Sequence, residues 1–520
     1  MTDMGFGVFA LAPPLITIVA AFITKQVMLS LFIGIFAAAT MLAGFNPGVG
    51  LVDAFRRFVF PSLGSTFNAS VVTMTFLVGA FSIMIERGGG AHAFAEALKG
   101  KVRTRKRGEI ATWLGSFVIF FSDSSSPVVV GPVFKPITDR LKISREKLAY
   151  IVDSTTCTMP VMVPFSAWGA FIMGIIAAQF DLMGYDGNPL LYHVASIPYQ
   201  LYPIAAIIMV FIIAASGFDY GPMIKAEKRA LYEGKLYRDG ANLLKPDFHA
   251  QIPEGARPTI WNMLLPIIVL LSTIFFLFLY TGGFFEGGIT VGQAMQGASA
   301  MPALNVAFFL ASWIAVFLAV KAKVFTLREA SKTWFDGMKS MTEANLILVL
   351  AWGIGSASSA VGAPAFIVSA TYGFLTPTML YVAVFIAASF TSFSTGTSWG
   401  TFAIFLPITI PLAYAIGAPI APAIAVALSG GIFGDHCSPV SDTTVLSSMG
   451  SSCDLMDHVI TQLPYALTAA LAATLGYLVV GFTGSAAGGL ATMLVSLTFL
   501  AFLLNKFWGT KVEERAAVAK

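Results

Sequence analysis

The stretch FGDHCSPVSDTTVLSS, from Phe433 to Ser448, places two aspartates, a histidine, a cysteine, a proline and a row of hydroxyl groups inside strongly apolar sequence. The chain of 520 residues is 57% hydrophobic and 11% charged, and its mean hydropathy is +0.80. A soluble globular protein carries roughly 25% charged residues. The composition therefore predicts an all-α polytopic membrane protein, with this polar stretch inside one of its membrane segments.

Apolar runs long enough for a spanning helix, which needs about 20 residues, predict about 11 spans. They fall at 8–24, 27–45, 66–86, 148–180, 197–216, 259–281, 301–320, 343–361, 420–450, 459–482 and 488–507. The runs 148–180 and 420–450 are too long for one plain helix and contain prolines, so we expect two broken helices. Two more apolar stretches, 109–134 and 379–417, carry polar tips in the middle and are typical of re-entrant hairpins.

The basic residues predict the orientation of these spans. Five segments, 99–107, 135–147, 225–257, 321–339 and 506–520, hold 27 of the 31 lysines and arginines. Cytoplasmic loops collect Lys and Arg, so we expect these segments, together with Lys25, on the cytoplasmic side of a cell (inner) membrane. The chain then begins outside and ends in the cytoplasm. Arg56 and Arg57 disagree, and their stretch LVDAFRRFVF is predicted to lie at the membrane surface.

Weak internal similarity accompanies this topology. FSDSSSP at 121 and FSTGTSW at 393 are 272 positions apart, and KPITDRL at 135 and LPITIPL at 406 are 271 apart. The first set follows an outside terminus and the second an inside loop, which predicts two inverted repeats. We assign 1–216 to the first repeat, 217–258 to a cytoplasmic linker, 259–482 to the second repeat, and 483–520 to an extra span and a cytoplasmic tail. Inverted repeats with interrupted helices are typical of secondary transporters, whose site lies near the midplane.

Four acids, Asp123, Asp153, Asp435 and Asp442, fall at predicted membrane depth, where a charge is costly and a functional interpretation is the default. Carboxylate, hydroxyl and unwound carbonyl oxygens together suit Na⁺ or a proton. The hydroxyl candidates at the two breaks and the two hairpin tips are Ser438, Ser441, Thr443, Thr444, Ser154, Thr155, Ser124, Ser394, Thr395, Thr397 and Ser398. These residues form the predicted ion- or substrate-binding site.

The second break is predicted around Pro439, which cannot continue a helix. Asp435 and Asp442 should therefore flank an unwound segment and converge on one cavity, with His436 as a further proton-coupling candidate. The first half has the counterpart DSTTCTMPVMVP, from Asp153 to Pro164, in which we match Cys157 and Pro160 with Cys437 and Pro439.

Structural and chemical alternatives stay open beside this interpretation. The four acids could also have a purely structural role, in which they tie or cap the broken helices. The hydroxyl groups at the hairpin tips could serve only to form hydrogen bonds with the loop backbone. His436 could form hydrogen bonds without gaining or losing a proton. A zinc site drawn from Asp435, His436, Cys437, Cys453, Asp457 and His458 lacks paired ligand spacing. A Ser-His-Asp hydrolase lacks a visible nucleophile elbow, so the sequence does not indicate an enzyme.

Two stretches, GDHCSPVSDTTVLSS (Gly434–Ser448) and STGTSWGTFAIFLP (Ser394–Pro407), resemble the NhaC-type Na⁺/H⁺ antiporter family. The resemblance implies an inverted-repeat carrier with an elevator mechanism and a site that includes Asp435, Ser438, Ser441, Asp442, Thr443, Thr444 and Ser394–Ser398. Such scaffolds often form homodimers. This chain has His436-Cys437 where well-known members have Lys-Met, and that departure leaves the ion stoichiometry and the substrate open.

Two functions therefore remain in view. The first is a Na⁺/H⁺ antiporter, which needs no cofactor beyond its transported Na⁺ and H⁺. The second is a Na⁺- or H⁺-coupled carrier of a small organic solute such as a carboxylate. In both, the partners are the lipid bilayer and the small ion or solute, with no nucleic acid.

Overall fold

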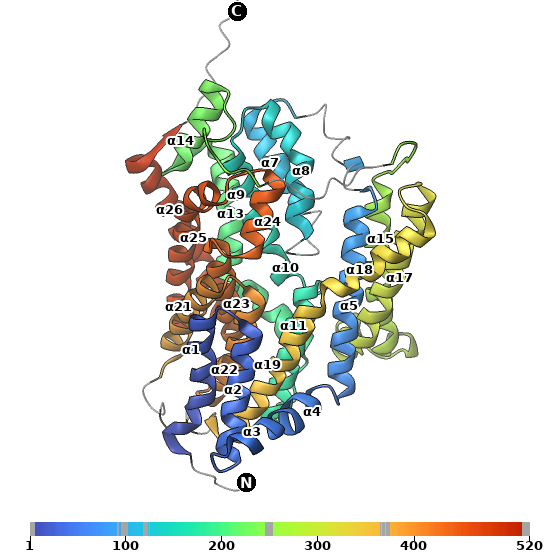
Figure 1. Cartoon of the computed structure of the whole chain (residues 1–520), viewed down its shortest axis with the longest axis vertical. Coiled ribbons are helices and arrows are strands. Elements are labelled where there is room, and N and C mark those ends of the chain that lie inside the picture. The colour runs from blue at the N-terminus through green and yellow to red at the C-terminus, as the bar shows by residue number, and fades with distance from the viewer. Residues whose placement is uncertain are drawn as a thin grey trace, which may run out of the picture.

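The computed structural model describes residues 6–90, 93–94, 102–117, 123, 125–244, 253–363, 366, 370 and 375–511. These residues are helical apart from turns, loops and two short strands, β1 (Phe218–Tyr220) and β2 (Gly509–Lys511), which pair antiparallel. Figure 1 shows the helices stacked along the long axis of the molecule. The predicted all-α class is confirmed.

The helices of the first half and the linker are η1 (Gly7–Leu11), α1 (Ala12–Thr24), α2 (Val27–Leu42), α3 (Pro47–Asp53), η2 (Ala54–Val59), α4 (Phe60–Ser62), α5 (Thr66–Arg87), α7 (Arg105–Ser116), α8 (Ser125–Arg140), α9 (Arg145–Thr156), α10 (Met159–Met162), α11 (Ala167–Met183), α12 (Pro189–Ser196), η3 (Ile197–Tyr199), α13 (Leu201–Ser216), α14 (Met223–Lys228) and η4 (Arg229–Glu233). Those of the second half are α15 (Trp261–Thr281), η5 (Phe284–Glu286), α16 (Val291–Gly297), α17 (Ala300–Lys321), α18 (Leu327–Ser340), α19 (Thr342–Ala360), α21 (Pro377–Thr395), α22 (Ser398–Ala415), α23 (Ile420–Cys437), α24 (Asp442–Ser451), α25 (Leu455–Thr483) and α26 (Ala486–Trp508).

Many of these helices have membrane-spanning length. Within the described residues, nine helices are long and apolar enough to cross a bilayer, or up to twelve when each of three bent pairs is counted as one span. Most of the predicted spans coincide with these helices to within a few residues; the predicted span 343–361 coincides with α19, which is not among them, and only α23 of the predicted span 420–450 is. One bent pair joins α2 to the α3–α4 stretch at an angle of 119°. That stretch contains LVDAFRRFVF and turns sharply away from α2, as a surface-lying segment does.

Both predicted broken helices are present. In the first half α9 and α10 are followed by a break at Val163–Ser166, and α11 continues at a bend of 41°. In the second half α23 ends at Cys437 and α24 begins at Asp442. The match of Pro160 with Pro439 was wrong, because Pro160 lies in the first turn of α10, where proline is tolerated.

Two helical hairpins accompany the broken helices. The first consists of α7 and α8, and most of its tip lies outside the described residues, including Ser124. The second consists of α21 and α22, which are joined by a short turn at Gly396 and Thr397. Each arm of the second hairpin is itself long enough to count as a candidate span. That both hairpins enter and leave the membrane on one side stays a prediction.

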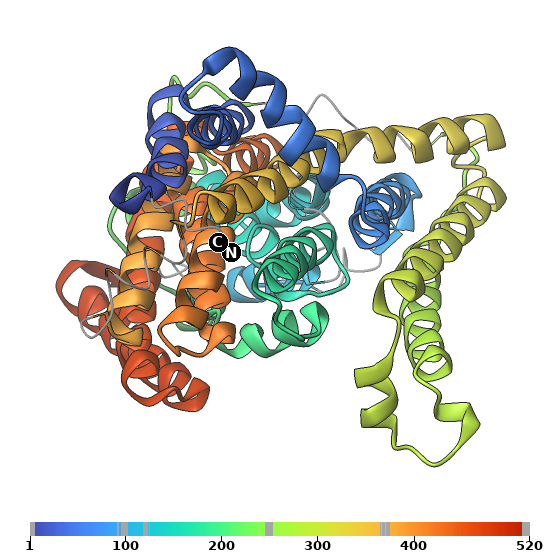
Figure 2. The same cartoon turned by 90° about the horizontal axis from the view of Figure 1, so that it is seen from below.

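An arm of helices stands apart from the main body. Seen from below, α15 and α17 extend away from the remaining helices (Figure 2) and pack mainly on each other, on α5 and on α18. The main body contains both broken helices and the second hairpin, with α21 packed along α23 and α24 packed on α8 and α9. The candidate site therefore lies in the main body.

The predicted cytoplasmic segments meet at one end of the molecule. Arg229 of η4 donates to Glu146 at the start of α9 with an Nη2–Oε1 distance of 2.7 Å, and Arg105 of α7 pairs with Glu227 of α14. The backbone N–H of Arg257 donates to the carbonyl oxygen of Ala322 after α17, at 2.9 Å. These contacts join segments 99–107, 135–147 and 225–257 and bring Arg257 to the start of segment 321–339, although which side of the membrane they face stays a prediction.

Lys25 differs from these segments. It lies in the turn between α1 and α2, and a Cβ added to Gly400 of α22 would come within 2.3 Å of the side chain of Val27. The turn therefore packs near the tip of the second hairpin, about halfway along the molecule in Figure 1. The grouping of Lys25 with the basic loops was wrong, because α1 and α2 form a short hairpin whose turn points into the bundle.

Candidate ion-binding site

The break in the second half collects oxygen atoms around Asp435. Its carboxylate is 1% exposed and accepts hydrogen bonds from Ser441 Oγ at 2.8 Å and Thr443 Oγ1 at 3.4 Å. Ser441 also caps α24 by accepting from the backbone N–H of Thr444 at 3.5 Å. Pro439 removes a backbone donor within the break. The end of one helix and the start of the next thus share a carboxylate–hydroxyl cluster.

The tip of the second hairpin packs directly on this break. Gly396 has a φ of +70°, and a Cβ there would lie 2.6 Å from the carbonyl oxygen of Val440. Ser438 Oγ donates to the carbonyl oxygen of Phe393 at 2.8 Å. Ser398 Oγ donates to the carbonyl oxygen of Gly431 at 3.3 Å, and its hydroxyl also interacts with Asp435. The structure thus brings Ser398 and Ser438 to the cluster.

The remaining tip and helix hydroxyls bond locally. Thr397 caps α22 by accepting from the N–H of Gly400 at 3.5 Å. Thr395 donates to the carbonyl oxygen of Thr391 at 2.9 Å, and Thr155 donates to that of Ile151 at 2.7 Å. Ser394 is half-buried. These contacts satisfy helix backbone and leave the binding role of the four residues Ser394, Thr395, Thr397 and Thr155 a prediction.

Asp153 of α9 reaches across from the first half into the second. Its carboxylate is fully buried and accepts from Gln462 Nε2 at 2.8 Å, Ser447 Oγ at 3.2 Å and Thr444 Oγ1 at 3.4 Å. Gln462 also donates to the carbonyl oxygen of His436, at 2.5 Å. Asp153 therefore joins α9, α24 and α25 around the break.

His436 is held between two hydroxyl groups. Its Nε2 lies 3.0 Å from Ser154 Oγ, and its Nδ1 lies 2.7 Å from the hydroxyl of Tyr202. A neutral imidazole has one donor and one acceptor nitrogen, and these two partners satisfy both. The geometry favours a hydrogen-bonding role for this buried ring, and its role in proton coupling stays a prediction.

Asp123 connects the two hairpin tips. Its Oδ2 accepts from the indole Nε1 of Trp168 at 3.0 Å and from that of Trp399 at 2.8 Å. Trp168 belongs to the first turn of α11 and Trp399 to the first turn of α22. The two indoles pack edge to face with centroids 5.5 Å apart. The first tip is thus fastened to the second tip through one buried carboxylate.

Asp442 differs from the other three acids because its side chain is exposed. Its Oδ1 accepts from the N–H of Thr443 at 2.9 Å. Its negative charge is close enough to repel the carboxylates of Asp435, Asp123 and Glu343. Asp435 and Asp442 flank the break as Pro439 predicts, with Asp435 inside the hydroxyl cluster and Asp442 exposed beside it; their convergence on one cavity stays a prediction.

From the sequence, Gln462 was missed in this network, and His458 was weighed only as a zinc ligand. His458 lies with its Nε2 3.7 Å from Asp153 Oδ2 and 2.9 Å from Gln462 Oε1, and its Nδ1 is 2.8 Å from Ser448 Oγ. His458 and Gln462 are four positions apart, which places them on one helix face. Polar side chains that share one face of an otherwise apolar helix indicate an intramembrane site.

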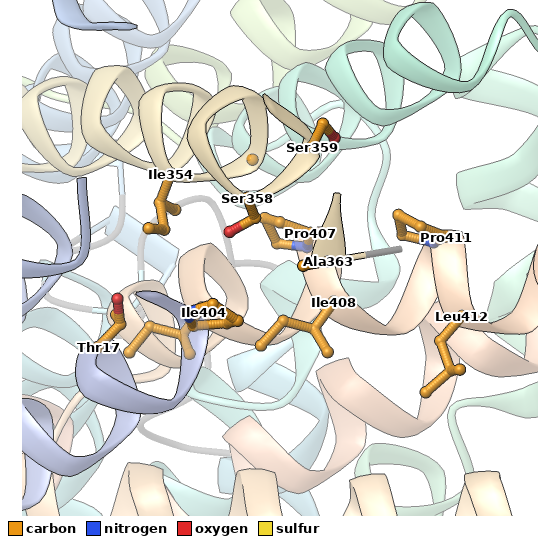
Figure 3. Close-up of a pocket in the computed structure, with 12 residues that line it drawn as sticks. Thr17, Ile354, Ser358, Ser359, Ala363, Ile404, Pro407, Ile408, Pro411 and Leu412 are labelled. Carbon is orange, nitrogen blue, oxygen red and sulfur yellow. The ribbon is translucent and has the colours of Figure 1, made fainter. Parts of the chain in front are cut away.

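A cavity lies outside this cluster. It is enclosed by α1, α19 and α22 (Figure 3), and its lining is mostly apolar, with hydroxyls from Thr17, Ser358 and Ser359. It contains none of the four acids. Among the described residues no group of three or more His, Cys, Asp or Glu side chains is arranged to hold a metal ion. The cluster at the second break, built from single carboxylates and hydroxyls, is therefore the candidate ion site.

Comparison with known proteins places this arrangement in a family. The model of the Na⁺/H⁺ antiporter family matches residues 159–482. The chain belongs to the Na⁺/H⁺ antiporter family. The matched range contains the second hairpin and the break around Asp435, and all but the start of the first broken helix. The resemblance inferred from the sequence is confirmed, and the chain is a multi-pass membrane protein and secondary transporter of this family.

Relatives within this family have diverse descriptions. A Haemophilus influenzae protein of unspecified function is 34% identical over 97% of both chains. The malate-2H⁺/Na⁺-lactate antiporter of Bacillus subtilis is 30% identical over 34% of this chain and 38% of its own. A Na⁺/H⁺ antiporter of Haemophilus influenzae is 33% identical over 16% of this chain and 18% of its own.

Solved structures confirm the fold. Neisseria gonorrhoeae MtrF, described within a class of antimetabolite efflux pumps, has a TM-score of 0.54 at 13% identity, covering 88% of this chain and 86% of its own. The Alcanivorax borkumensis YdaH transporter also has a TM-score of 0.54, at 15% identity, covering 86% of this chain and 89% of its own. At these identities the likeness concerns the fold alone.

Proposed function

We propose that this transporter exchanges Na⁺ for H⁺ and that Asp435 and Asp442 are the coupling acids. The observation that carries the proposal is the cluster in which Asp435 accepts from Ser441 and Thr443 beside a broken helix. Carboxylate and hydroxyl oxygens are the ligands that a hard cation prefers. Among the described residues, no lysine or arginine forms an ion pair with either acid, so both carboxylates are available to a cation.

Antiport follows from competition at these carboxylates. A bound proton removes the negative charge that holds Na⁺, and a bound Na⁺ opposes protonation. One site that holds either ion, but moves poorly when empty and charged, exchanges the two ions. Ser438 and Ser398 hold the break and the tip together around Asp435, which keeps this site intact during movement.

The proposed movement is that of an elevator. Within the main body the two halves pack backbone to backbone, since a Cβ on Gly131 of α8 would lie 2.4 Å from the carbonyl carbon of Gly450 in α24. The arm of α15 and α17 packs instead on α5 and α18. We propose that the hairpins and broken helices move as one body against this arm, which also offers a surface for a homodimer.

Purified protein in liposomes tests the exchange. An internal pH dye should report alkalinisation after external pulses of Na⁺ or Li⁺, because each entering cation is exchanged for protons that leave the lumen. Asp435→Asn and Asp442→Asn should remain folded and lose this response. A pH response that is unchanged in both variants would contradict the role of the acids.

A second candidate is a Na⁺- or H⁺-coupled carrier of a small carboxylate. It is favoured by the partial similarity to the malate-2H⁺/Na⁺-lactate antiporter and by the hydroxyl-rich second tip. Uptake of labelled malate or lactate into the same liposomes, without any cation-dependent pH change, would establish this carrier and exclude simple Na⁺/H⁺ exchange.

The orientation is also part of the proposal, with the basic segments in the cytoplasm. Cysteine replacements at Glu233 and Asp186 test it, because both side chains are exposed and the three native cysteines are buried. A membrane-impermeant thiol reagent applied to intact cells should label Asp186→Cys and leave Glu233→Cys unlabelled. The reverse pattern would overturn the orientation.

A further inference from the structure

A row of charged side chains runs along α18 and into the first turn of α19. Lys332, Asp336, Lys339 and Glu343 follow one another at intervals of four, three and four positions. Residues at these intervals lie on one helix face. Lys332, Lys339 and Glu343 are exposed and Asp336 is half-buried, and Lys339 Nζ lies 3.2 Å from Asp336 Oδ1. We call these four residues the charged row.

The charged row lies deep in the bundle rather than at its end. Trp334 of α18 donates its Nε1–H to Ser312 Oγ at 2.9 Å, and Ser312 is near the middle of α17. A Cβ on Gly79 would lie 2.3 Å from the carbonyl oxygen of Gly337, and Gly79 is near the middle of α5. Figure 1 shows α18 descending from the end of α17 toward α19.

This depth decides what surrounds the charged row. A charged side chain that faces lipid at the centre of a bilayer is costly, and such residues face the bundle interior or water. Lys339 and Glu343 lie beyond Gly337 along the chain and are nevertheless exposed. Water is the surrounding that stabilises these four charges, three of them on exposed side chains, at the depth of the middle of α5 and α17.

The far end of the charged row meets the candidate ion site. The charge of Glu343 acts on that of Asp442, and both side chains are exposed. Glu343 belongs to α19 and Asp442 to α24, which are separate elements of the bundle. Glu343 and Asp442 are therefore near enough for their charges to interact on the exposed side of the site.

We propose that the charged row lines a water-filled passage from the end of the bundle where the basic segments lie to Asp442, and that Glu343 is a positioning residue that concentrates small cations beside it. The identity of the cation rests on the proposed function, whereas the passage does not. A carboxylate at the end of a narrow passage raises the local cation concentration by about tenfold or more. Lys339, paired with Asp336, limits the total negative charge along the route.

Thiol labelling tests the passage without any transport measurement. Lys339→Cys and Glu343→Cys should react with a charged, membrane-impermeant reagent applied in detergent-free vesicles from the side of the basic segments. Leu271→Cys is the matched control, because Leu271 is 50% exposed in an apolar row with Ile268 and Phe275 on α15 and should not react if lipid covers that row. If all three cysteines fail to react, lipid or protein covers the charged row and the passage is refuted.

Cation kinetics test the positioning role. Glu343→Gln should raise the KM for the cation about tenfold at low ionic strength with a nearly unchanged maximal rate, and the effect should shrink as added salt screens the charge. Glu286→Gln, the same change at an exposed site in η5, should leave KM unchanged. An unchanged KM in Glu343→Gln would overturn the role of Glu343. If the labelling succeeds while no cation drives exchange in the parent, the proposed function fails and the passage stands.

Discussion

Both broken helices resume after a proline and a serine N-cap, but different side chains flank the two breaks. In the first, Pro164 precedes Ser166, which caps α11 by accepting from the N–H of Gly169 at 3.0 Å. In the second, Pro439 precedes Ser441, which caps α24 in the same way. After the first break, the first turn of α11 contains Trp168. The second break has Asp435 on one side and Asp442 on the other. Of the two breaks, only the second is flanked by carboxylates on both sides.

Their outer ends differ as well. The first broken helix begins among ion pairs, with Lys147 paired to Asp219 and Glu146 to Arg229. The second begins at Ile420, where the hydroxyl of Tyr381 donates to the carbonyl oxygen of Pro419 at 2.9 Å. The first helix has ion pairs at its outer end and one buried acid, Asp153, farther along, whereas within the described residues the second has no ion pair at its start and acids on both sides of its break. The comparison shows that, in the part of the chain that the structure describes, the outer ion pairs belong to the first half alone.

The largest expected effect is on coupled exchange, and it should distinguish the second break, which has flanking carboxylates, from the first. Asp435→Asn should reduce coupled exchange at least about 100-fold, since removing even an outer partner of a metal ligand costs about 10–100-fold. Proton release on cation binding should fall in parallel, as measured with a pH indicator. Phe165→Leu, a change at the first break, should retain exchange. Equal losses in both variants would mean that the breaks are functionally equivalent.

The next effect is on stability and concerns the ion pair between Arg229 and Glu146 at the outer end of the first broken helix. Arg229→Leu leaves Glu146 buried without its partner, which should lower the free energy of unfolding by about 3–5 kcal/mol. Arg238→Leu is the control, because Arg238 pairs with Asp457 on an exposed surface and should cost at most about 1 kcal/mol. Similar losses in the two variants, measured by denaturant unfolding in detergent, would remove the distinction between the two ends.

The loss of stability in Arg229→Leu should depend on pH in a defined direction. Burial already holds the pKa of Glu146 above its ordinary value although Arg229 opposes the shift. Removing Arg229 raises this pKa further, so the folded state of the variant binds a proton more tightly than the unfolded chain. The stabilisation that comes from this proton is complete below the pKa of Glu146 in the unfolded chain, and it is lost as the pH rises through the pKa of Glu146 in the folded protein. The defect of Arg229→Leu should therefore shrink on acidification, and a defect that grows would contradict the pairing.

A smaller effect tests the contact between tip and break. Gly396→Ala forces an alanine into the left-handed region at a cost of roughly 1–2 kcal/mol and places its Cβ against Val440. Gly417→Ala imposes similar backbone strain at a φ of +69° with no atom within 4 Å. Gly396→Ala should lose more stability, because the backbone of Val440 must also shift, and only Gly396→Ala should slow exchange. Equal exchange rates would show that the tip contact is dispensable.

The smallest effect compares the two caps. Ser166→Ala and Ser441→Ala should each lower the free energy of unfolding by about 1 kcal/mol, the ordinary cost of losing an N-cap. Only Ser441→Ala should also weaken cation binding, because Ser441 donates to Asp435 as well. The cation dependence of exchange in the two variants checks this, and identical curves would make Ser441 a cap alone.

Much of the fold was predictable because length and hydropathy are strong signals. The polar cluster at 433–448 and its proline predicted the second break and both flanking acids. Asp153 was singled out, but its bonds to Ser447 and Gln462 were not, since contacts between segments 294 and 309 positions apart leave no local pattern. The cap at Ser166 was missed because two prolines, Pro160 and Pro164, gave equal reason to expect the break. The charged row was counted only as cytoplasmic charge, since a one-dimensional pattern does not show that α18 descends into the bundle.

The bonds of Asp153 also constrain how the protein is made. Its three donors lie 291, 294 and 309 residues later in the chain. During synthesis the first broken helix must therefore reach the membrane with this carboxylate still unsatisfied, and it waits until α24 and α25 have been inserted. The two halves consequently mature together, and a chain that stops before α25 carries a buried acid that has no lasting place in lipid.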